Sequence, residues 1–346
     1  MSNLELPNKL NLAQLPTPIQ KLEYISQLIH RDVYVKRDDF THLEMSGNKL
    51  RKLEYLLAEA KRKGSKTVFT AGAVQSNHVR ATAIACAKLS LGCVVFLKET
   101  LEIKQAAPKV EGNLYLTTLA GAKVVWVDEQ ELKEPARVFL KHADEFKIRD
   151  GVLPFFIAVG GSQDFGALGY FSAFEEIQKQ SLDMGIQFDS IVCATGSGGT
   201  HAGLILGRNY FDANETTRII AFDIIGDSNV MIEKAKTVAL AAIQRFRLPI
   251  SLGRDDIDVI GGYVGIAYAK PTVEQYQFLA EVFRREGILF DPVYAGKALF
   301  GLVKECLNQN TRFGQKILFL NSGGFASCFV DSHREGMLGV LVSKDS

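Results

Sequence analysis

Cysteine is scarce in this sequence and follows no pattern. None of the five cysteines belongs to a CxxC pair, and they are scattered along 346 residues as Cys86, Cys93, Cys193, Cys306 and Cys328. An odd number without paired spacing gives no disulfide framework and no structural zinc motif. We therefore expect a reduced, cytoplasmic protein without a metal centre, in which the cysteines are small core residues.

An excess of charge and long apolar runs are also missing. Lys and Arg total 40 against 39 Asp and Glu, so the net charge is +1. Such a balance offers no basic surface for nucleic acid and no polybasic attraction to a membrane. No apolar run approaches the about 20 residues that span a bilayer. The start, "MSNLELPNKLNLAQLP", lacks the apolar centre of a signal peptide. We expect neither a nucleic-acid partner nor a membrane.

What the chain does contain is typical of a folded α/β protein. Hydrophobic residues make up 47% and charged residues 23%. Short apolar segments alternate with helical patterns, which favours parallel sheets covered by helices on both faces. Strands are predicted at 32–38, 67–71, 93–99, 122–127, 153–158, 188–194, 216–225 and 316–324. Helices are predicted at 47–63, 77–91, 112–121, 130–146, 167–181, after 200, and at 231–246, 272–286 and 296–308.

This length suits two domains or one large unit. The strand–helix units that follow Lys49 can form a small domain, residues 49–159. The rest, residues 1–48 and 160–346, then forms a larger one. Residues 248–265 are the least regular and are predicted to be a surface loop with a short strand. Ligands of such folds bind at the carboxyl ends of the strands.

The most specific turn is "CATGSGGTHAG", residues 193–203, between a predicted strand and a predicted helix. Its glycines leave backbone N–H groups free to surround an anion, and its hydroxyls add donors. A tight turn without a ligand is the alternative. A dinucleotide fingerprint needs glycine where His201 stands, and a P-loop needs a lysine that is absent. The turn therefore favours a monophosphate cofactor, held by Thr195, Gly196, Ser197, Gly198, Gly199 and Thr200.

A lysine stands at another loop-to-helix boundary. In "MSGNKLRKLEYLL", Lys49 directly follows Ser46-Gly47-Asn48 at the start of a predicted helix. A lysine amine near a phosphate site indicates a cofactor that carries an aldehyde. Lys52 lies three residues on, on the same helical face. On the residues alone, it can be an ordinary solvated lysine.

Five motifs together resemble a known enzyme family. They are "VKRDDFTHLEMSGNKLRKLEYLL", "TAGAVQSNHVRATA", "GSGGTHAG", "DPVYAGKA" and "NSGG". In this order they resemble the fold-type-II pyridoxal-phosphate enzymes, from about Leu15 to Phe329. Within these, the sequence is similar to the D-cysteine desulfhydrase and 1-aminocyclopropane-1-carboxylate (ACC) deaminase family. The resemblance implies a two-domain α/β fold like that of the tryptophan synthase β-subunit, with open, twisted, mostly parallel sheets, and a homodimer.

The resemblance also implies roles for single residues. Lys49 forms the Schiff base with pyridoxal 5'-phosphate and then acts as the base at the substrate Cα. Neighbouring cations such as Lys52, together with the bound substrate environment, are expected to lower its pKa. The resemblance also implies that Lys52 helps to hold the phosphate. Ser76, Asn77 and the His78 backbone hold the substrate carboxylate, and Asn77 also lies near the ring oxygen of the cofactor. Capping of a helix by Ser76 and Asn77 is the alternative, and both can be true.

Three further positions bear on the substrate. Tyr268 and Tyr294 match the two active-site tyrosines of the family, although each can be an ordinary half-buried tyrosine. ACC deaminases carry a glutamate where this chain has Ala295, and a leucine where it has Ser322. Ser322 offers the ring nitrogen only a neutral hydrogen bond, a weaker electron sink that suits β-elimination. Ala295 also differs from the Ser or Thr that is more frequent in desulfhydrases.

We therefore expect an α,β-eliminating lyase that acts on a small amino acid. D-cysteine is favoured, and its products are pyruvate, hydrogen sulfide and ammonia. The alternatives are an ACC deaminase that gives 2-oxobutyrate, a lyase for another β-substituted alanine, and a non-catalytic binding protein. The last is disfavoured because the residues named for catalysis are all present.

Overall fold

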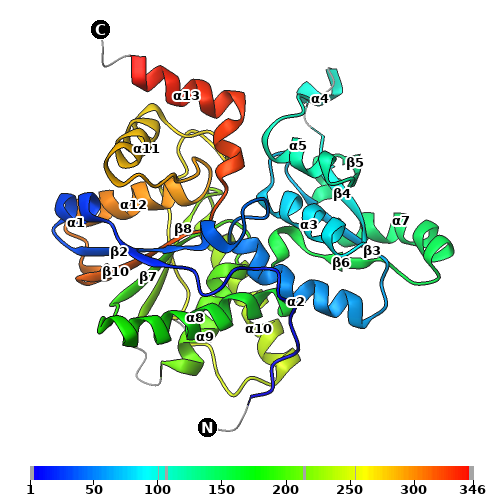
Figure 1. Cartoon of the computed structure of the whole chain (residues 1–346), viewed down its shortest axis with the longest axis horizontal. Coiled ribbons are helices and arrows are strands. Elements are labelled where there is room, and N and C mark those ends of the chain that lie inside the picture. The colour runs from blue at the N-terminus through cyan, green and yellow to red at the C-terminus, as the bar shows by residue number, and fades with distance from the viewer. Residues whose placement is uncertain (1–3, 100, 106–107, 213–215, 254, 343–346) are drawn as a thin grey trace.

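The computed structural model describes residues 4–99, 101–105, 108–212, 216–253 and 255–342 and contains two separate sheets (Figure 1). The larger sheet has six strands in the order β1-β2-β10-β7-β8-β9. All pairs are parallel except β1 with β2. The strands are β1 (Ile19–Lys21), β2 (Asp32–Arg37), β7 (Ser190–Thr195), β8 (Arg218–Asp223), β9 (Asp258–Ile260) and β10 (Lys316–Asn321).

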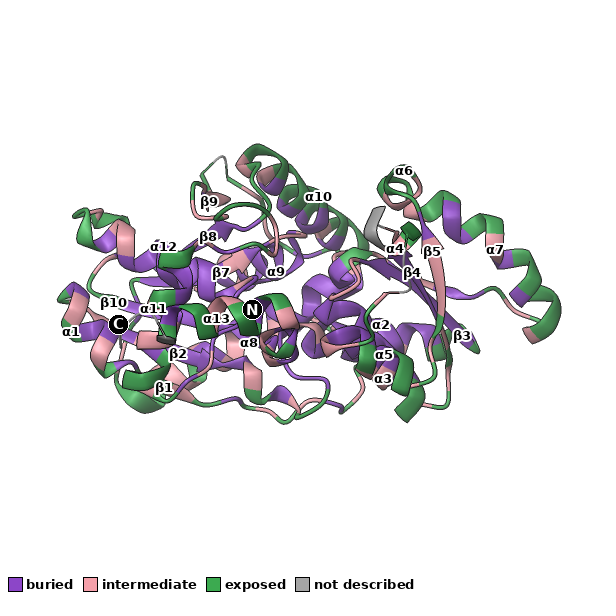
Figure 2. Cartoon of the chain, turned by 90° about the horizontal axis from the view of Figure 1, so that it is seen from above, coloured by how far each residue is buried: buried purple, intermediate pink, exposed green. Residues whose placement is uncertain are grey.

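Alternating side chains of this sheet enter two different cores, as its two-residue period requires. Phe319 of β10 and Phe222 of β8 face one core, with α1 (Glu23–Ile29), α11 (Val273–Glu286) and α12 (Ala295–Leu307). Leu318 and Ile219 face the other core, with α8 (Asp164–Met184) and α9 (Gly199–Phe211). Both faces are therefore covered, and the central strands β7, β8 and β10 are almost entirely buried, as Figure 2 shows.

The smaller sheet has four parallel strands in the order β5-β4-β3-β6. They are β3 (Thr67–Gly72), β4 (Gly92–Lys98), β5 (Lys123–Val127) and β6 (Phe155–Ile157). An aromatic core joins one face to α7 (Pro135–Asp150), where Phe69 packs edge-on against Phe146 at 4.9 Å. The other face packs against α3 (Asn77–Lys88) and α5 (Gly112–Leu119). The domain boundaries at 48/49 and 159/160 stay a prediction.

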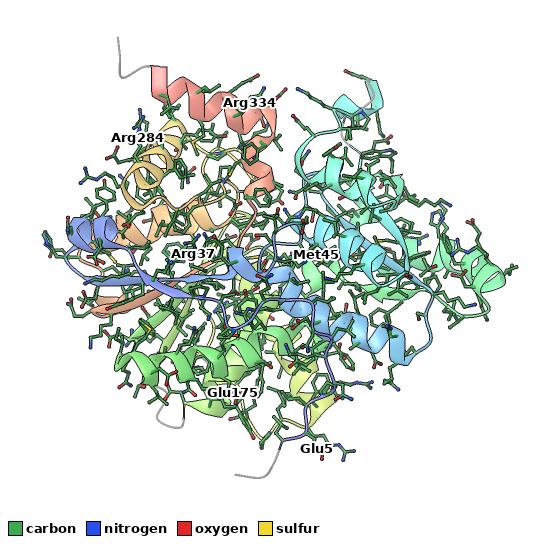
Figure 3. The ribbon with its side chains drawn as sticks, viewed as in Figure 1. Glu5, Arg37, Met45, Glu175, Arg284 and Arg334 are labelled. Carbon is green, nitrogen blue, oxygen red and sulfur yellow. The ribbon has the colours of Figure 1, made fainter. Side chains whose placement is uncertain are left out.

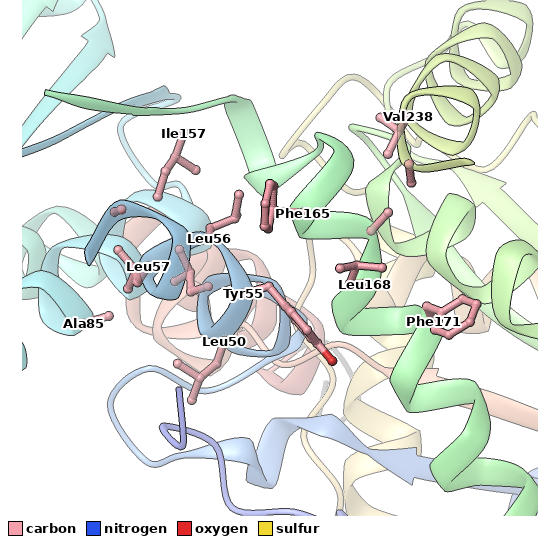
Figure 4. Packing of buried hydrophobic residues seen from close by; sticks show 14 of the residues in the cluster. Leu50, Tyr55, Leu56, Leu57, Ala85, Ile157, Phe165, Leu168, Phe171 and Val238 are labelled. Atoms are coloured by element: carbon pink, nitrogen blue, oxygen red, sulfur yellow. The ribbon is translucent and has the colours of Figure 1, made fainter. Parts of the chain in front are cut away.

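One helix connects the two sheets. Leu50, Leu56 and Leu57 of α2 (Asn48–Arg62) share a core with Phe165 and other residues of α8. Figure 4 shows this cluster together with Ile157 of β6, Ala85 of α3 and Val238 of α10 (Ser228–Phe246). Because α2 is buried against elements of both sheets, the residue at its start is held between them.

Most predicted elements are present, with a few differences. The helix predicted at 130–146 is wrong as one element, because α6 (Glu129–Lys133) ends before α7 begins at Pro135. Proline lacks an N–H group and is tolerated only in the first turn, which is where Pro135 lies in α7. Four elements were not predicted from the sequence: β1, α1, α4 (Leu101–Gln105) and α13 (Asp331–Val342). The short strand expected within 248–265 is β9. None of the helices among the described residues combines the length and apolar composition needed to cross a bilayer.

Candidate active site

A cavity of about 570 Å³ lies between the two sheets, beside the carboxyl ends of β3, β7 and β10. The start of α2 and the loops after these three strands line it. In Figure 3 the labelled Met45, just ahead of α2, lies in the middle of the molecule. Most of the residues that the sequence singled out line this one cavity: Lys49, Ser76, Asn77, His78, Thr195, Gly196, Ser197, Gly198, Thr200, Tyr268, Tyr294 and Ser322. Lys52 and Gly199 are not in its lining.

Lys49 is placed by a close contact between the start of α2 and the end of β10. Gly47 has φ +113°, and a Cβ there would lie 2.3 Å from the Ser322 carbonyl oxygen, so only glycine fits. The Asn48 N–H donates to the same oxygen at 3.1 Å. This contact sets the first turn of α2 against the cavity and brings Lys49 and Ser322 to the same wall.

Burial lowers the pKa of Lys49 from 10.5 to about 8, and Asp291 opposes the shift. The expected cause was different, because the sequence assigned this shift to neighbouring cations such as Lys52. That expectation is wrong, since desolvation is the cause that lowers it. Burial and the charge of Lys49 lower the pKa of Lys52 well below its ordinary value, so Lys52 is already neutral where Lys49 titrates and adds no positive charge beside it. A lysine with a pKa of about 8 is partly neutral near pH 7 and can act as a nucleophile or a base.

Lys52 is fully buried, so the alternative of a solvated lysine is wrong. Its Nζ donates to the Gly160 carbonyl at 3.2 Å. Burial lowers its pKa well below the ordinary value. A Cβ on Gly199 would lie 2.9 Å from this Nζ, so the amine is directly behind the glycine turn. A buried ammonium without a carboxylate partner is costly, and an anion bound at the turn would offset that cost.

The glycine turn joins β7 to α9 and is held in place by contacts with α10 and Ser162. Gly198 has φ +82°, and a Cβ there would lie 2.7 Å from the Ala235 backbone nitrogen of α10. The Ser162 hydroxyl donates to Ser197 Oγ at 2.8 Å and accepts from the Gly199 N–H at 3.1 Å. The Gly199 N–H is therefore engaged with protein. Thr195 Oγ1 is buried and has no hydrogen-bond partner among the described residues, so a ligand in this cavity could satisfy it.

The QSNH segment begins α3. Ser76 Oγ accepts from the Val79 N–H at 3.3 Å, so the predicted cap is present. Thr70 Oγ1 donates to the Ile157 carbonyl at 2.9 Å, so at its 2.8 Å contact with His78 Nε2 it must accept. The His78 ring is thus held by the smaller sheet. The first-turn N–H groups of α3 have no partner within the helix and can bind a carboxylate.

Tyr268 and Tyr294 meet at the other side of the cavity. Their hydroxyl oxygens are 2.5 Å apart, and their rings are nearly perpendicular at 72°. Burial raises the pKa of both phenols, so both keep their protons at neutral pH. One O–H is used between the two oxygens, which leaves the other free to donate to a ligand.

Asp291 is a buried carboxylate near the site that sequence reasoning did not single out. Its carboxylate accepts from the backbone N–H groups of Val293, Tyr294 and Ala295 at 2.8–3.0 Å, at the start of α12. Burial raises its pKa to about 6. Lys297 is also buried, and it donates to the Ala267 carbonyl at 2.9 Å, beside Tyr268. Asp291 was part of a quoted motif, but only tertiary contacts reveal this position.

The rim of the cavity was also not predicted. The break between α6 and α7 places Leu132, Lys133 and Pro135 on one side of it. Ile225, after β8, and Lys234, from α10, lie in the same lining. Pro135 was the visible signal for the break, whereas nothing in the local sequence marks Lys234.

These residues fit pyridoxal phosphate. Lys49 supplies an amine of lowered pKa for an aldehyde. The glycine turn, Lys52 behind it and the unpartnered Thr195 hydroxyl supply a site for a phosphate. The two groups line or adjoin one cavity, as a single small cofactor requires.

Comparisons with known proteins agree with this chemistry. The sequence profile described as "Pyridoxal-phosphate dependent enzyme" matches residues 10–323. A D-cysteine desulfhydrase of Yersinia enterocolitica is 37% identical over 93% of this chain and 95% of its own length. A Thermotoga maritima protein, provisionally named a 1-aminocyclopropane-1-carboxylate deaminase, is 37% identical over 94% of this chain and 99% of its own. The crystal structure of an ACC deaminase homologue superimposes with a TM-score of 0.84, at 37% identity and 96% coverage of both chains.

Proposed function

Because this chain belongs to the family of pyridoxal-phosphate-dependent enzymes, we propose that it is a lyase that eliminates the β-substituent of D-cysteine. With water, D-cysteine would give pyruvate, hydrogen sulfide and ammonia. The fold is that of the fold-type-II enzymes of this class. Relatives bearing the desulfhydrase and the deaminase names are equally similar, so the choice depends on residues in the cavity.

The observation that carries the choice is that, among the described residues, no Asp or Glu lines the cavity, whereas Ser322 does. Ser322 lines the cavity, and Ala295, whose methyl group is buried in a hydrophobic core, does not. Asp291 is the only carboxylate that acts on the pKa of Lys49 within the described residues, and three backbone donors engage it. A cofactor ring whose nitrogen is bonded to a hydroxyl would be a weaker electron sink than one bonded to a carboxylate. A weaker sink suits the loss of a good leaving group such as hydrosulfide.

The cofactor, when bound through Lys49, supplies a sink for the electron pair left at the substrate Cα. We assign its phosphate to Lys52 and the turn from Thr195 to Thr200. Lys49 in its neutral form removes the Cα proton. Ser76 and the first-turn N–H groups of Asn77 and His78 would bind the substrate carboxylate, and the Asn77 amide would hold the ring oxygen of the cofactor.

The tyrosine pair is assigned to the leaving group. Tyr268 and Tyr294 keep their protons at neutral pH because burial raises both pKa values. The O–H that is not used between them can protonate the departing sulfur. This role needs no other acid in the cavity.

The test is keto-acid release from D-cysteine, L-cysteine and 1-aminocyclopropane-1-carboxylate, with sulfide measured in the thiol samples. Equal amounts of pyruvate and sulfide from D-cysteine alone are the expected result. Release of 2-oxobutyrate from the cyclopropane substrate would favour the deaminase and contradict the argument from Ser322 and Ala295. Light scattering on the same sample tests the homodimer that the resemblance implies.

A further inference from the structure

Arg80 is a buried cation that the proposed mechanism does not use. It lies in the first turns of α3, one turn after Asn77, and none of its side chain is exposed. No carboxylate of the described residues forms an ion pair with it, and its Nε has no partner. Its two terminal nitrogens donate to the Ser46 carbonyl at 2.8 Å and to Asn113 Oδ1 at 3.0 Å. It therefore connects α5 with the loop that precedes Lys49.

These contacts determine which way two amides point. A guanidinium can only donate, so Asn113 must present its oxygen to Arg80. The NH₂ group of Asn113 then faces the opposite direction, where it donates to Asn77 Oδ1 and to the Gln75 carbonyl, both at 2.9 Å. Asn77 consequently presents its oxygen to Asn113 and turns its own NH₂ group away. In the described part of the chain, no protein atom accepts from that NH₂ group.

The position of Asn113 is itself fixed by close packing. Its backbone N–H donates to Gln75 Oε1 at 2.8 Å, and Gln75 Nε2 donates to the Glu111 carbonyl at 3.1 Å. A Cβ on Gly112, which has φ +52°, would lie 2.7 Å from both Gln75 Oε1 and a Val330 methyl group. The start of α5 is thus pressed onto the QSNH segment with no room to shift.

The opposite side leaves space for the Asn77 amide. Gly324, in the loop after β10, has φ +104°, and a Cβ there would lie 2.7 Å from Asn77 Nδ2. Asn77 also lines the cavity. The Asn77 side chain is therefore held on one side by the bond from Asn113 to its oxygen, and on the other side by Gly324 next to its NH₂ group.

We propose that Asn113, oriented by Arg80, is a positioning residue that keeps the NH₂ group of Asn77 directed at the ring oxygen of the cofactor. Neither Arg80 nor Asn113 lines the cavity. Both act through Asn77. This inference rests on the role proposed for Asn77 above. It adds that the direction of the Asn77 amide is determined by two successive hydrogen bonds, from Arg80 to Asn113 and from Asn113 to Asn77.

The test measures the pH titration of the visible absorption band of the purified holoenzyme. A donor to the ring oxygen stabilises its anionic form. In Asn113→Asp both side-chain oxygens accept, so Arg80 keeps its partner while Asn77 must turn its NH₂ group toward position 113. The ring oxygen then loses its donor, and we expect the titration midpoint to rise by about one to two pH units.

Thr117→Val is the matched control. Thr117 is buried one turn further along α5, and its hydroxyl donates only to the Asn113 carbonyl, at 2.7 Å. We expect it to keep the wild-type midpoint. Asn113→Ala removes the orienting amide without adding charge, and it serves if Asn113→Asp does not fold; here too the midpoint should rise.

The proposal would be overturned if Asn113→Asp, or Asn113→Ala in its place, binds the cofactor and its absorption band titrates with the wild-type midpoint. An equal rise in Thr117→Val would do so as well, because the effect would then come from packing of α5. The readout does not involve turnover. A wild-type enzyme that binds the cofactor but releases no sulfide would contradict the proposed substrate and leave this titration readable.

Discussion

Lys49 is the residue on which the proposed reaction depends most directly. Its replacement by alanine removes both the attachment point of the cofactor and the base. We expect Lys49→Ala to lose the visible band and to lower turnover by about a thousandfold or more. Lys61→Ala, an exposed lysine on the same helix, is the control and should leave both unchanged. Absorption spectra and sulfide release check the pair, and turnover retained in Lys49→Ala would remove the assignment.

The pH dependence of turnover follows from the same amine. Burial lowers the pKa of Lys49 to about 8, and only the neutral form accepts a proton. Turnover should therefore rise about tenfold per pH unit below pH 8 and level off above it. The tyrosines add no falling limb near neutrality, because burial raises both of their pKa values. Initial rates between pH 6 and 9 measure this, and a flat profile would contradict it.

The role of Tyr294 can be distinguished from that of Lys49 by measuring sulfide release and Cα proton exchange in the same variant. If the tyrosine pair protonates the leaving sulfur, Tyr294→Phe should slow sulfide release by about a hundredfold. Exchange of the substrate Cα proton with deuterated solvent should continue, because Lys49 is intact. Tyr276→Phe is the control, since the Tyr276 hydroxyl lies 2.8 Å from His333 Nδ1 and Tyr276 does not line the cavity. Equal loss of exchange and release in Tyr294→Phe would argue against the acid role.

The sequence predicted the site residues that belong to contiguous motifs. Lys49, Ser76 and the glycine turn are each marked by the loop-to-helix boundary at which they stand. Arg80 and Asn113 carry no such mark, because their partners lie 30 or more residues away, and the effect of Asp291 on Lys49 likewise arises only in the folded chain. A burial effect such as that on Lys49 is likewise a property of packing, which explains why its cause was assigned wrongly.

At the scale of elements, the start of α12 depends on one carboxylate. Asp291 accepts hydrogen bonds from three backbone N–H groups there. Its charge also opposes the lowering of the Lys49 pKa by burial. Asp291→Asn replaces one acceptor by a donor, and we expect a loss of about 1–3 kcal/mol in the free energy of unfolding. The rising limb of turnover should also move to lower pH, because Lys49 loses the opposing charge.

Thr272→Ala is the control for this variant. Thr272 caps the neighbouring helix α11 through its bond from the Gln275 N–H at 3.2 Å and does not line the cavity. Its loss should cost about 1 kcal/mol and leave the pH profile unchanged. Urea unfolding and pH–rate profiles distinguish the two variants. A profile for Asp291→Asn identical to the wild type would show that Asp291 supports only the helix.

Elements with strong local signals were predicted well and those without were not. The helices α2, α3 and α9 combine an apolar period with a glycine or a cap at the start. In contrast, β1 has three residues and α4 has five, too few for any period to appear. Pro135 marks the break between α6 and α7, but the polar pattern continues across it and predicts a single helix.

At the scale of the whole molecule, a buried ionic network fixes α2, and with it Lys49, to the larger sheet. Arg51 donates to Asp38 at 2.8 Å and to Glu176 of α8 at 2.9 Å. Lys36 of β2 reaches the same glutamate at 2.5 Å, and the Tyr170 hydroxyl donates to Asp38 at 2.5 Å. Burial alone raises the pKa of Asp38, but Arg51 and Lys36 outweigh it and hold the pKa below the ordinary value of 3.8.

The network predicts both the size and the sign of a stability change. Removal of the Asp38 charge leaves Arg51 with one carboxylate in the interior, so Asp38→Asn should lower the free energy of unfolding by about 3–5 kcal/mol at pH 7. Because the folded pKa of Asp38 is depressed, its contribution is complete above pH 3.8 and is lost as the pH falls through the folded value. The difference between wild type and variant should therefore shrink in acid.

Glu175→Gln supplies the matched control on α8, one residue from Glu176. Glu175 pairs with Lys179 at the surface, at 2.7 Å, where such pairs contribute about 0.5 kcal/mol or less. Urea unfolding at pH 7 and at pH 3 measures all three proteins. A large loss in Glu175→Gln, or a loss in Asp38→Asn that stays constant in acid, would contradict the assignment of this stability to the buried charges. If instead the loss in Asp38→Asn is large and pH-dependent, and cofactor affinity falls with it, then the ionic network is what holds Lys49 at the cavity wall.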